Sequence, residues 1–90
     1  MIATRELVYG VYVRAPDDID VFQVDFEPGT YALTDGRGHT IVVATEDGAY
    51  TWCEYDEADV PEKAHNTNGS VDPADVTRVL WRWVDAHSED

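Results

Sequence analysis

Hydrophobic residues recur at helical spacing near the end of the chain. Between Asp72 and His87 they form one stripe made of Val76, Val79, Leu80, Trp83 and Val84, which is typical of a helix with one buried face. Asp72 can accept hydrogen bonds from first-turn N–H groups, and Pro73 suits the first helical position. The pattern predicts a helix over residues 72–87 whose stripe covers a surface formed by the upstream sequence.

The upstream sequence is rich in β-branched and aromatic residues and predicts strands. Five are expected, over residues 6–14, 19–26, 30–34, 39–46 and 49–55. Asp47-Gly48 is a strong two-residue hairpin signal, and counting outward from it pairs Val43 with Trp52. The glycine-rich segment 35–38 lacks the Lys-Ser/Thr of a phosphate loop, so it is expected to close another hairpin.

At least two of these strands are apolar on both faces, although only one helix is expected to cover a sheet. In the best hairpin, one face carries Tyr50 and Trp52, and the other carries smaller side chains such as Val42 and Cys53, which could lie beneath the helix. A sheet with one solvated face should alternate cleanly between apolar and polar residues. We therefore expect an α+β fold with residual apolar surface for a partner. It is a five-stranded, mainly antiparallel meander or small SH3-like barrel with one C-terminal helix.

Ninety residues provide one domain, over 1–90. Within it the sequence predicts a sheet over 5–55, a polar loop over 56–71 and the helix over 72–87. A structureless connection of that length is uncommon in a small domain. It is either a mobile linker or a segment that a partner orders.

The chain is strongly acidic, with 19 acidic residues, 6 basic residues and a formal net charge of −13. Such a charge destabilises the compact state by self-repulsion unless salt screens it. This composition indicates a salt-adapted source; an acidic partner-binding protein from a GC-rich genome is the alternative. The negative field opposes direct binding to nucleic acid, although a DNA mimic would use it.

The beginning of the chain lacks the long apolar run of a signal peptide, and no segment approaches the about 20 apolar residues of a membrane helix. We therefore expect a cytoplasmic or virion protein that is not secreted by a signal peptide and makes no membrane contact.

Catalytic and metal-binding motifs are not apparent. His39, His65 and His87 do not have the spacing of His-x-x-x-His ligands, and a site assembled in space, such as His65 with Asp56 or Asp59, is the alternative. Cys53 lies within an apolar strand and is expected to be a buried structural thiol. The sequence thus predicts no catalytic residue, no metal ligand and no cofactor.

Trp81 lies outside the apolar stripe of the predicted helix, with Arg78 and Arg82 beside it. Trp and Arg are enriched at binding hot spots, although Arg stems can also shield an exposed indole. Together with Trp52 and Tyr50, these residues are the candidate partner contacts.

The leading hypothesis is a non-enzymatic structural or protein-interaction subunit of a larger assembly, either a virion component or part of a host complex. Its partner would be another protein or a second copy of the chain, and no small-molecule substrate is inferred. Two alternatives remain open: an acidic regulatory inhibitor or DNA mimic that binds a basic protein surface, and a small metal-dependent enzyme.

Overall fold

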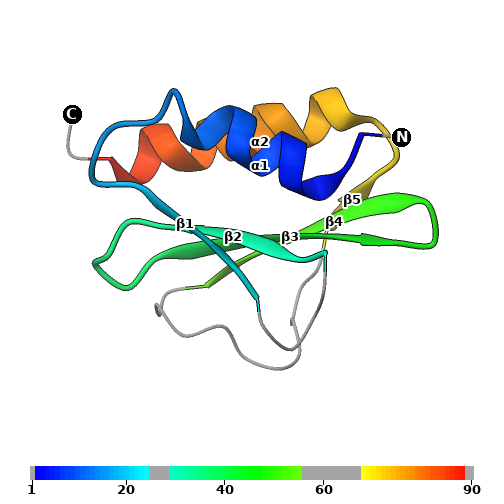
Figure 1. Cartoon of the computed structure of the whole chain (residues 1–90), viewed down its shortest axis with the longest axis horizontal. Helices are drawn as coiled ribbons and strands as arrows, with labels where there is room; N and C mark the ends of the chain where they lie inside the picture. Colours follow the sequence, from blue (N-terminus) through cyan, green and yellow to red (C-terminus); the bar gives the residue numbers. More distant parts are fainter. Residues whose placement is uncertain (1, 25–28, 56–67, 89–90) are drawn as a thin grey trace.

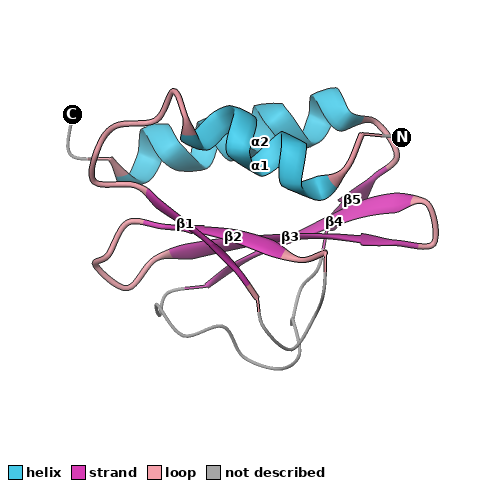
Figure 2. Cartoon of the chain, in the orientation of Figure 1, coloured by secondary structure: helices cyan, strands magenta, loops and turns pink. Residues whose placement is uncertain are grey.

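Two helices lie side by side on one face of a five-stranded sheet (Figures 1 and 2). The computed structural model describes residues 2–24, 29–55 and 68–88. The elements in chain order are α1 (Thr4–Tyr12), β1 (Asp20–Gln23), β2 (Tyr31–Thr34), β3 (Thr40–Glu46), β4 (Ala49–Tyr55), β5 (Asn68–Ser70) and α2 (Pro73–His87). The chain is therefore an α+β protein, as predicted.

The sheet is an antiparallel meander in which each strand pairs with the next strand along the chain. The predicted β3–β4 register is confirmed, with Val43 opposite Trp52. Asp47 and Gly48 form the turn with φ values of 51° and 79°, as a two-residue primed turn requires. Among the described strands β1 and β5 are the two ends of the order, so of the two predicted arrangements the meander is the one observed.

The prediction of a strand over residues 6–14 is wrong, because this segment contains helix α1. Leu7, Val8 and Val11 are buried against the core, and their spacing is that of one helical face. Val13 follows the helix and is 71% exposed. The β-branched and aromatic residues favoured a strand locally, whereas burial of a single helical face decided the structure. The molecule therefore has two helices instead of one.

The predicted loop over 56–71 contains a strand at its end. Residues 68–70 form β5, which pairs antiparallel with residues 50–52 of β4. The remainder of that loop, including His65, Asp56 and Asp59, lies outside the described residues, as does the predicted continuation of the second strand over residues 25–26. The sheet still has five strands because β5 takes the place of the strand expected at 6–14.

The helices cover the face of the hairpin that carries Tyr50 and Trp52, and not the face with the smaller side chains. The main core joins side chains of both helices to the central strands: Leu7, Val8, Val11, Ile19, Leu33, Ile41, Val43, Tyr50, Val76, Leu80, Trp83 and Val84. The rings of Tyr50 and Trp52 have more apolar surface than alanine or cysteine side chains, so placing the helices on their face removes more apolar surface from water. A second cluster of Val24, Ala32 and Val42, with Phe22 and Tyr55 against it, is separate from this core.

Helix α2 follows its prediction closely. The Asp72 side chain accepts a hydrogen bond of 2.9 Å from the Ala74 N–H, and Pro73 begins the helix. Val76, Leu80, Trp83 and Val84 of the predicted stripe are buried. In the described part of the chain, neither helix combines the length and the apolar character that crossing a membrane requires.

Candidate functional site

An open groove of about 580 Å³ lies between α2 and the β4–β5 side of the sheet. We call it the α2–β4 groove; it is lined by Trp52, Glu54, Gly69, Val79, Arg82, Trp83 and Ala86. Its α2 residues stand three or four positions apart and so share one side of the helix. Trp52 and Glu54 are alternate residues of β4 and so share one face of the sheet.

The groove has a mixed polar and apolar lining that includes two opposite charges. Half-buried Trp52 supplies aromatic surface and buried Trp83 forms part of the floor, while Arg82 and Glu54 are exposed. Neither charged side chain forms an ion pair with another described residue. Aromatic anchors with a few polar groups are typical of sites that bind a side chain of a partner.

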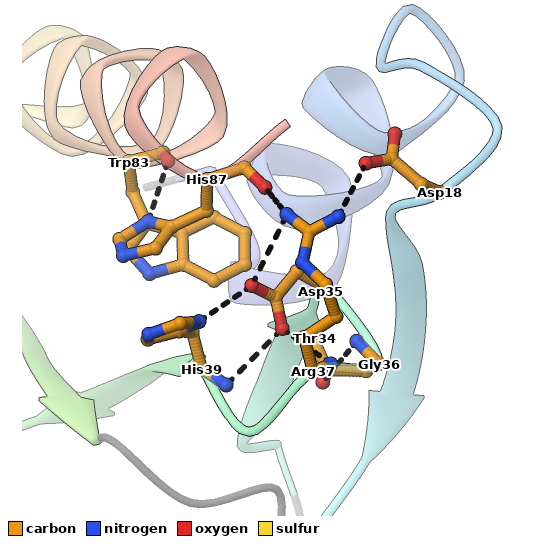
Figure 3. A network of polar contacts seen from close by, with 8 residues as sticks. All are labelled: Asp18, Thr34, Asp35, Gly36, Arg37, His39, Trp83 and His87. Atoms are coloured by element: carbon orange, nitrogen blue, oxygen red, sulfur yellow. Dashed lines mark hydrogen bonds and ion pairs between the residues drawn. The ribbon is translucent and has the colours of Figure 1, made fainter. Parts of the chain in front are cut away.

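A hydrogen-bonded cluster lies beside the groove, where the β2–β3 turn meets the end of α2 (Figure 3). We call it the histidine cluster; it consists of Asp35, Arg37, His39, Trp83 and His87. One carboxylate oxygen of Asp35 accepts the backbone N–H groups of Arg37 at 2.7 Å and His39 at 3.1 Å. The other accepts from Nδ1 of His39 at 2.6 Å. Asp35 therefore closes the glycine-rich turn and also fixes a histidine ring.

The buried carboxyl group of Asp35 is held in its ionised form. Burial raises its pKa, but hydrogen bonds from the Arg37 backbone and from the side chain and backbone of His39 outweigh burial. As a result, the pKa of Asp35 lies below its ordinary value. The Arg37 guanidinium lies 3.6 Å from Asp35 and also 3.6 Å from Asp18.

The ring of His87 lies against two other rings of this region at a tilted angle. Its ring centroid is 4.8 Å from that of Trp83 and 4.7 Å from that of His39. Nδ1 of His87 lies 2.9 Å from the backbone oxygen of Trp83, one helical turn earlier. Arg37 donates a hydrogen bond to the His87 carbonyl oxygen, which attaches the β2–β3 turn to the end of α2. Trp83 thus borders both the groove and the histidine cluster.

The Asp35–His39 pair has the geometry of an oriented base, but no nucleophile accompanies it in the described part of the chain. There, no Ser, Thr or Cys side chain is hydrogen-bonded to His39. Cys53 is buried, as expected, and lies on the opposite face of the sheet. Within the described ranges, no group of three or more His, Cys, Asp or Glu side chains is arranged to hold a metal ion. Among the described residues, the Asp35–His39 pair is therefore an oriented histidine without an adjacent side-chain nucleophile.

The structure brings only two of the five predicted contacts together, Trp52 and Arg82, in the α2–β4 groove. Trp81 is half-buried and packs against the main core, so it is less exposed than the helical pattern indicated. Arg78 is exposed and pairs with Asp75 at 3.1 Å.

Tyr50 is not a surface residue. It is 1% exposed, and its hydroxyl group donates a hydrogen bond to the backbone oxygen of Ile2. As folded, it therefore supports the β4 hairpin and the start of the chain, and its ring is not presented at the surface as a candidate contact would be.

Sequence reasoning missed the other groove residues and the pairing of His39 with His87. Trp83 was counted only as part of the helical stripe, and Glu54 only as a residue of the hairpin. The two histidines lie far apart in sequence, and their meeting depends on how α2 crosses the sheet. The usable signal was Asp35, which precedes two glycines and His39 in a hairpin turn, where Asp commonly binds backbone N–H groups.

No protein-family model, curated protein or solved structure matches this chain.

Proposed function

We propose that this chain is a non-enzymatic structural or protein-interaction subunit of a larger assembly, and that the α2–β4 groove is its contact with a second copy of the chain. The observation that carries the proposal is the rim of the groove, where exposed Arg82 and Glu54 stand beside the half-buried ring of Trp52. A patch with both charges is complementary to itself. In a two-fold contact, Arg82 of each copy meets Glu54 of the other.

The net charge of the chain indicates the salt concentration at which the proposed assembly forms. At a formal charge of −13, two copies repel each other in dilute buffer. The screening length falls from about 10 Å at 0.1 M salt to about 3 Å at 1 M, so repulsion over the whole surface fades while direct contacts persist. We therefore place the assembly in a salt-rich cytoplasm or in a virion formed there.

A charge swap tests the proposed contact. Sedimentation at the lowest KCl concentration that supports the wild-type dimer gives its dissociation constant. We expect Arg82→Glu or Glu54→Arg to weaken the dimer about tenfold, because two rim pairs worth up to about 1 kcal/mol each are lost. The double variant Glu54→Arg/Arg82→Glu restores the complementary charges and is expected to recover most of the affinity.

Arg78→Glu is the matched control for Arg82→Glu. It makes the same change of charge on the same exposed face of α2, but outside the groove. It is expected to change the dissociation constant by no more than about twofold. A chain that stays monomeric at every KCl concentration, or an Arg78→Glu variant as weak as Arg82→Glu, contradicts the proposed contact.

The acidic charge also supports a second candidate, an inhibitor or DNA mimic that occupies a basic protein surface. This candidate predicts a folded monomer at all salt concentrations and binding to a basic protein that weakens steeply as KCl rises. The two candidates thus respond to salt in opposite directions, since screening favours self-association and opposes binding to a basic partner.

A further inference from the structure

In each histidine of the cluster, one ring nitrogen lies against an oxygen atom that can accept a hydrogen bond but cannot donate one. Nδ1 of His39 faces the ionised carboxylate of Asp35, and Nδ1 of His87 faces the carbonyl oxygen of Trp83. Each Nδ1 must therefore carry the proton in the neutral ring, which leaves the lone pair on Nε2. This is the arrangement that orients metal-binding histidines in proteins, where the second nitrogen is held by a carboxylate or a backbone carbonyl.

The separation of the two rings suits a shared ion. Their centroids are 4.7 Å apart and their planes are inclined by 37°. With metal–nitrogen distances of about 2.0–2.1 Å, two imidazoles in neighbouring coordination positions have centroids roughly 4.5–5 Å apart. In Figure 3 the ring nitrogens without a dashed line lie on the side of the cluster away from Arg37.

The surroundings also allow an ion to enter. The His39 side chain is 40% exposed, and Asp35 occupies the Nδ1 edge of its ring. Asp35 supplies a negative charge beside His39, and the nearby positive charge of Arg37 is directed to Asp35, to Asp18 and to the His87 carbonyl oxygen. The net charge of −13 raises the local concentration of cations around the molecule.

We propose that His39 and His87 bind one divalent late transition-metal ion, such as Zn²⁺ or Cu²⁺, through their Nε2 atoms. Imidazole selects these ions over Mg²⁺ and Ca²⁺, which prefer oxygen ligands. Two protein ligands leave the other coordination positions to water. The ion joins the β2–β3 turn to the end of α2, and the site is independent of the proposed self-association.

Calorimetric titration with Zn²⁺, in molar KCl with millimolar Mg²⁺ to occupy loosely held cation positions, tests the proposal. We expect one equivalent to bind, and NMR spectra of the imidazole nitrogens to show large shifts at Nε2 of His39 and His87. Addition of Cu²⁺ is expected to quench part of the tryptophan fluorescence, because the ring centroid of Trp83 lies 4.8 Å from that of His87.

His39→Gln and His87→Gln are each expected to lower the Zn²⁺ affinity at least about tenfold. His65→Gln removes the remaining imidazole of the chain and is the matched control, expected to retain the bound equivalent. The proposal is overturned if Zn²⁺ does not bind stoichiometrically, if either His39→Gln or His87→Gln binds as the wild type does, or if His65→Gln loses the equivalent as fully as they do.

Asp35→Asn tests whether Asp35 sets the tautomer of His39 for metal binding, while it keeps the hydrogen bonds that close the turn. The amide oxygen can still accept both backbone N–H groups of the turn, while the amide nitrogen donates to Nδ1 of His39. The proton then moves to Nε2 and blocks its lone pair. We expect a 10- to 100-fold loss of Zn²⁺ affinity with an unchanged circular dichroism spectrum; wild-type affinity in this variant would contradict the assigned nitrogen.

Discussion

The hydroxyl group of Thr40 is buried at the start of β3 and has no hydrogen-bond partner among the residues that the structure describes. A buried hydroxyl group that has lost its water contacts and gained no partner reduces stability. Thr40→Val keeps the branched shape and removes that group, so we expect the free energy of unfolding to rise by about 1 kcal/mol. Urea unfolding followed by circular dichroism measures the change.

Thr4→Val is the matched control for this prediction. Thr4 is also buried, but its hydroxyl group is hydrogen-bonded to that of Thr45. Its replacement is expected to lower the free energy of unfolding by about 1 kcal/mol, since a partner is lost. If the two substitutions change stability in the same direction, the Thr40 hydroxyl has a partner in solution.

At the scale of single residues, the sequence identifies residue types that are frequent at interfaces, but it does not say whether each side chain is exposed or buried. Trp52 and Arg82 were chosen because Trp and Arg are frequent at interfaces, and the structure places both in one groove. The same reasoning chose Tyr50, which is buried because the helices cover its face of the sheet. Which face a helix covers depends on the packing of the whole sheet, and a local pattern contains no information about it.

Gly10 provides a test of α1 at the scale of elements. It is exposed in the last turn of the helix, and a Cβ atom added there would meet no atom within 4 Å. Gly10→Ala is therefore expected to raise the free energy of unfolding by about 0.5–1 kcal/mol, because alanine loses less conformational freedom in a helix. Thermal and urea unfolding measure the gain.

Gly48→Ala is the control, because Gly48 has a φ of 79° that alanine adopts only with strain. It is expected to lower the free energy of unfolding by about 1 kcal/mol. Destabilisation by Gly10→Ala would contradict the assignment of residues 4–12 to a helix.

Local signals predicted two elements well and missed two others. The β3–β4 hairpin and α2 each contain their own start or turn residues, Asp47-Gly48 and Asp72-Pro73, so their prediction required no tertiary contact. In contrast, α1 contains residues that favour strands and has no side-chain cap at Ala3. Strand β5 is the Asn-Gly-Ser sequence of a turn, and it is extended because β4 offers a free edge.

The whole molecule should respond to salt through its charge. At −13, repulsion among the carboxylates opposes the folded state, and KCl screens it. We expect the melting temperature to rise by several degrees between dilute buffer and molar KCl, since each kcal/mol gained is worth about 4–8 °C in a domain of this size.

A variant with fewer charges provides the comparison. Asp20→Asn, Glu46→Gln and Asp85→Asn replace three exposed carboxylates of the described surface. The combined variant is expected to be more stable than the wild type in dilute buffer and to gain less from KCl. If both proteins gain equally, the salt response does not arise from carboxylate repulsion, and the proposed salt adaptation loses its support.

The order of elements in the meander has a consequence for folding. Every pair of neighbouring strands is also consecutive in the chain, so the sheet can grow by closing one hairpin after another at a small entropic cost. The contact between α1 and α2 is different, because it joins the first element to the last. Closing it requires nearly the whole chain to be in place, so we expect the α1–α2 contact to form late. Helix α1 also packs against β1, β2 and β3, which follow it directly in the chain, so it can dock on these strands before α2 arrives.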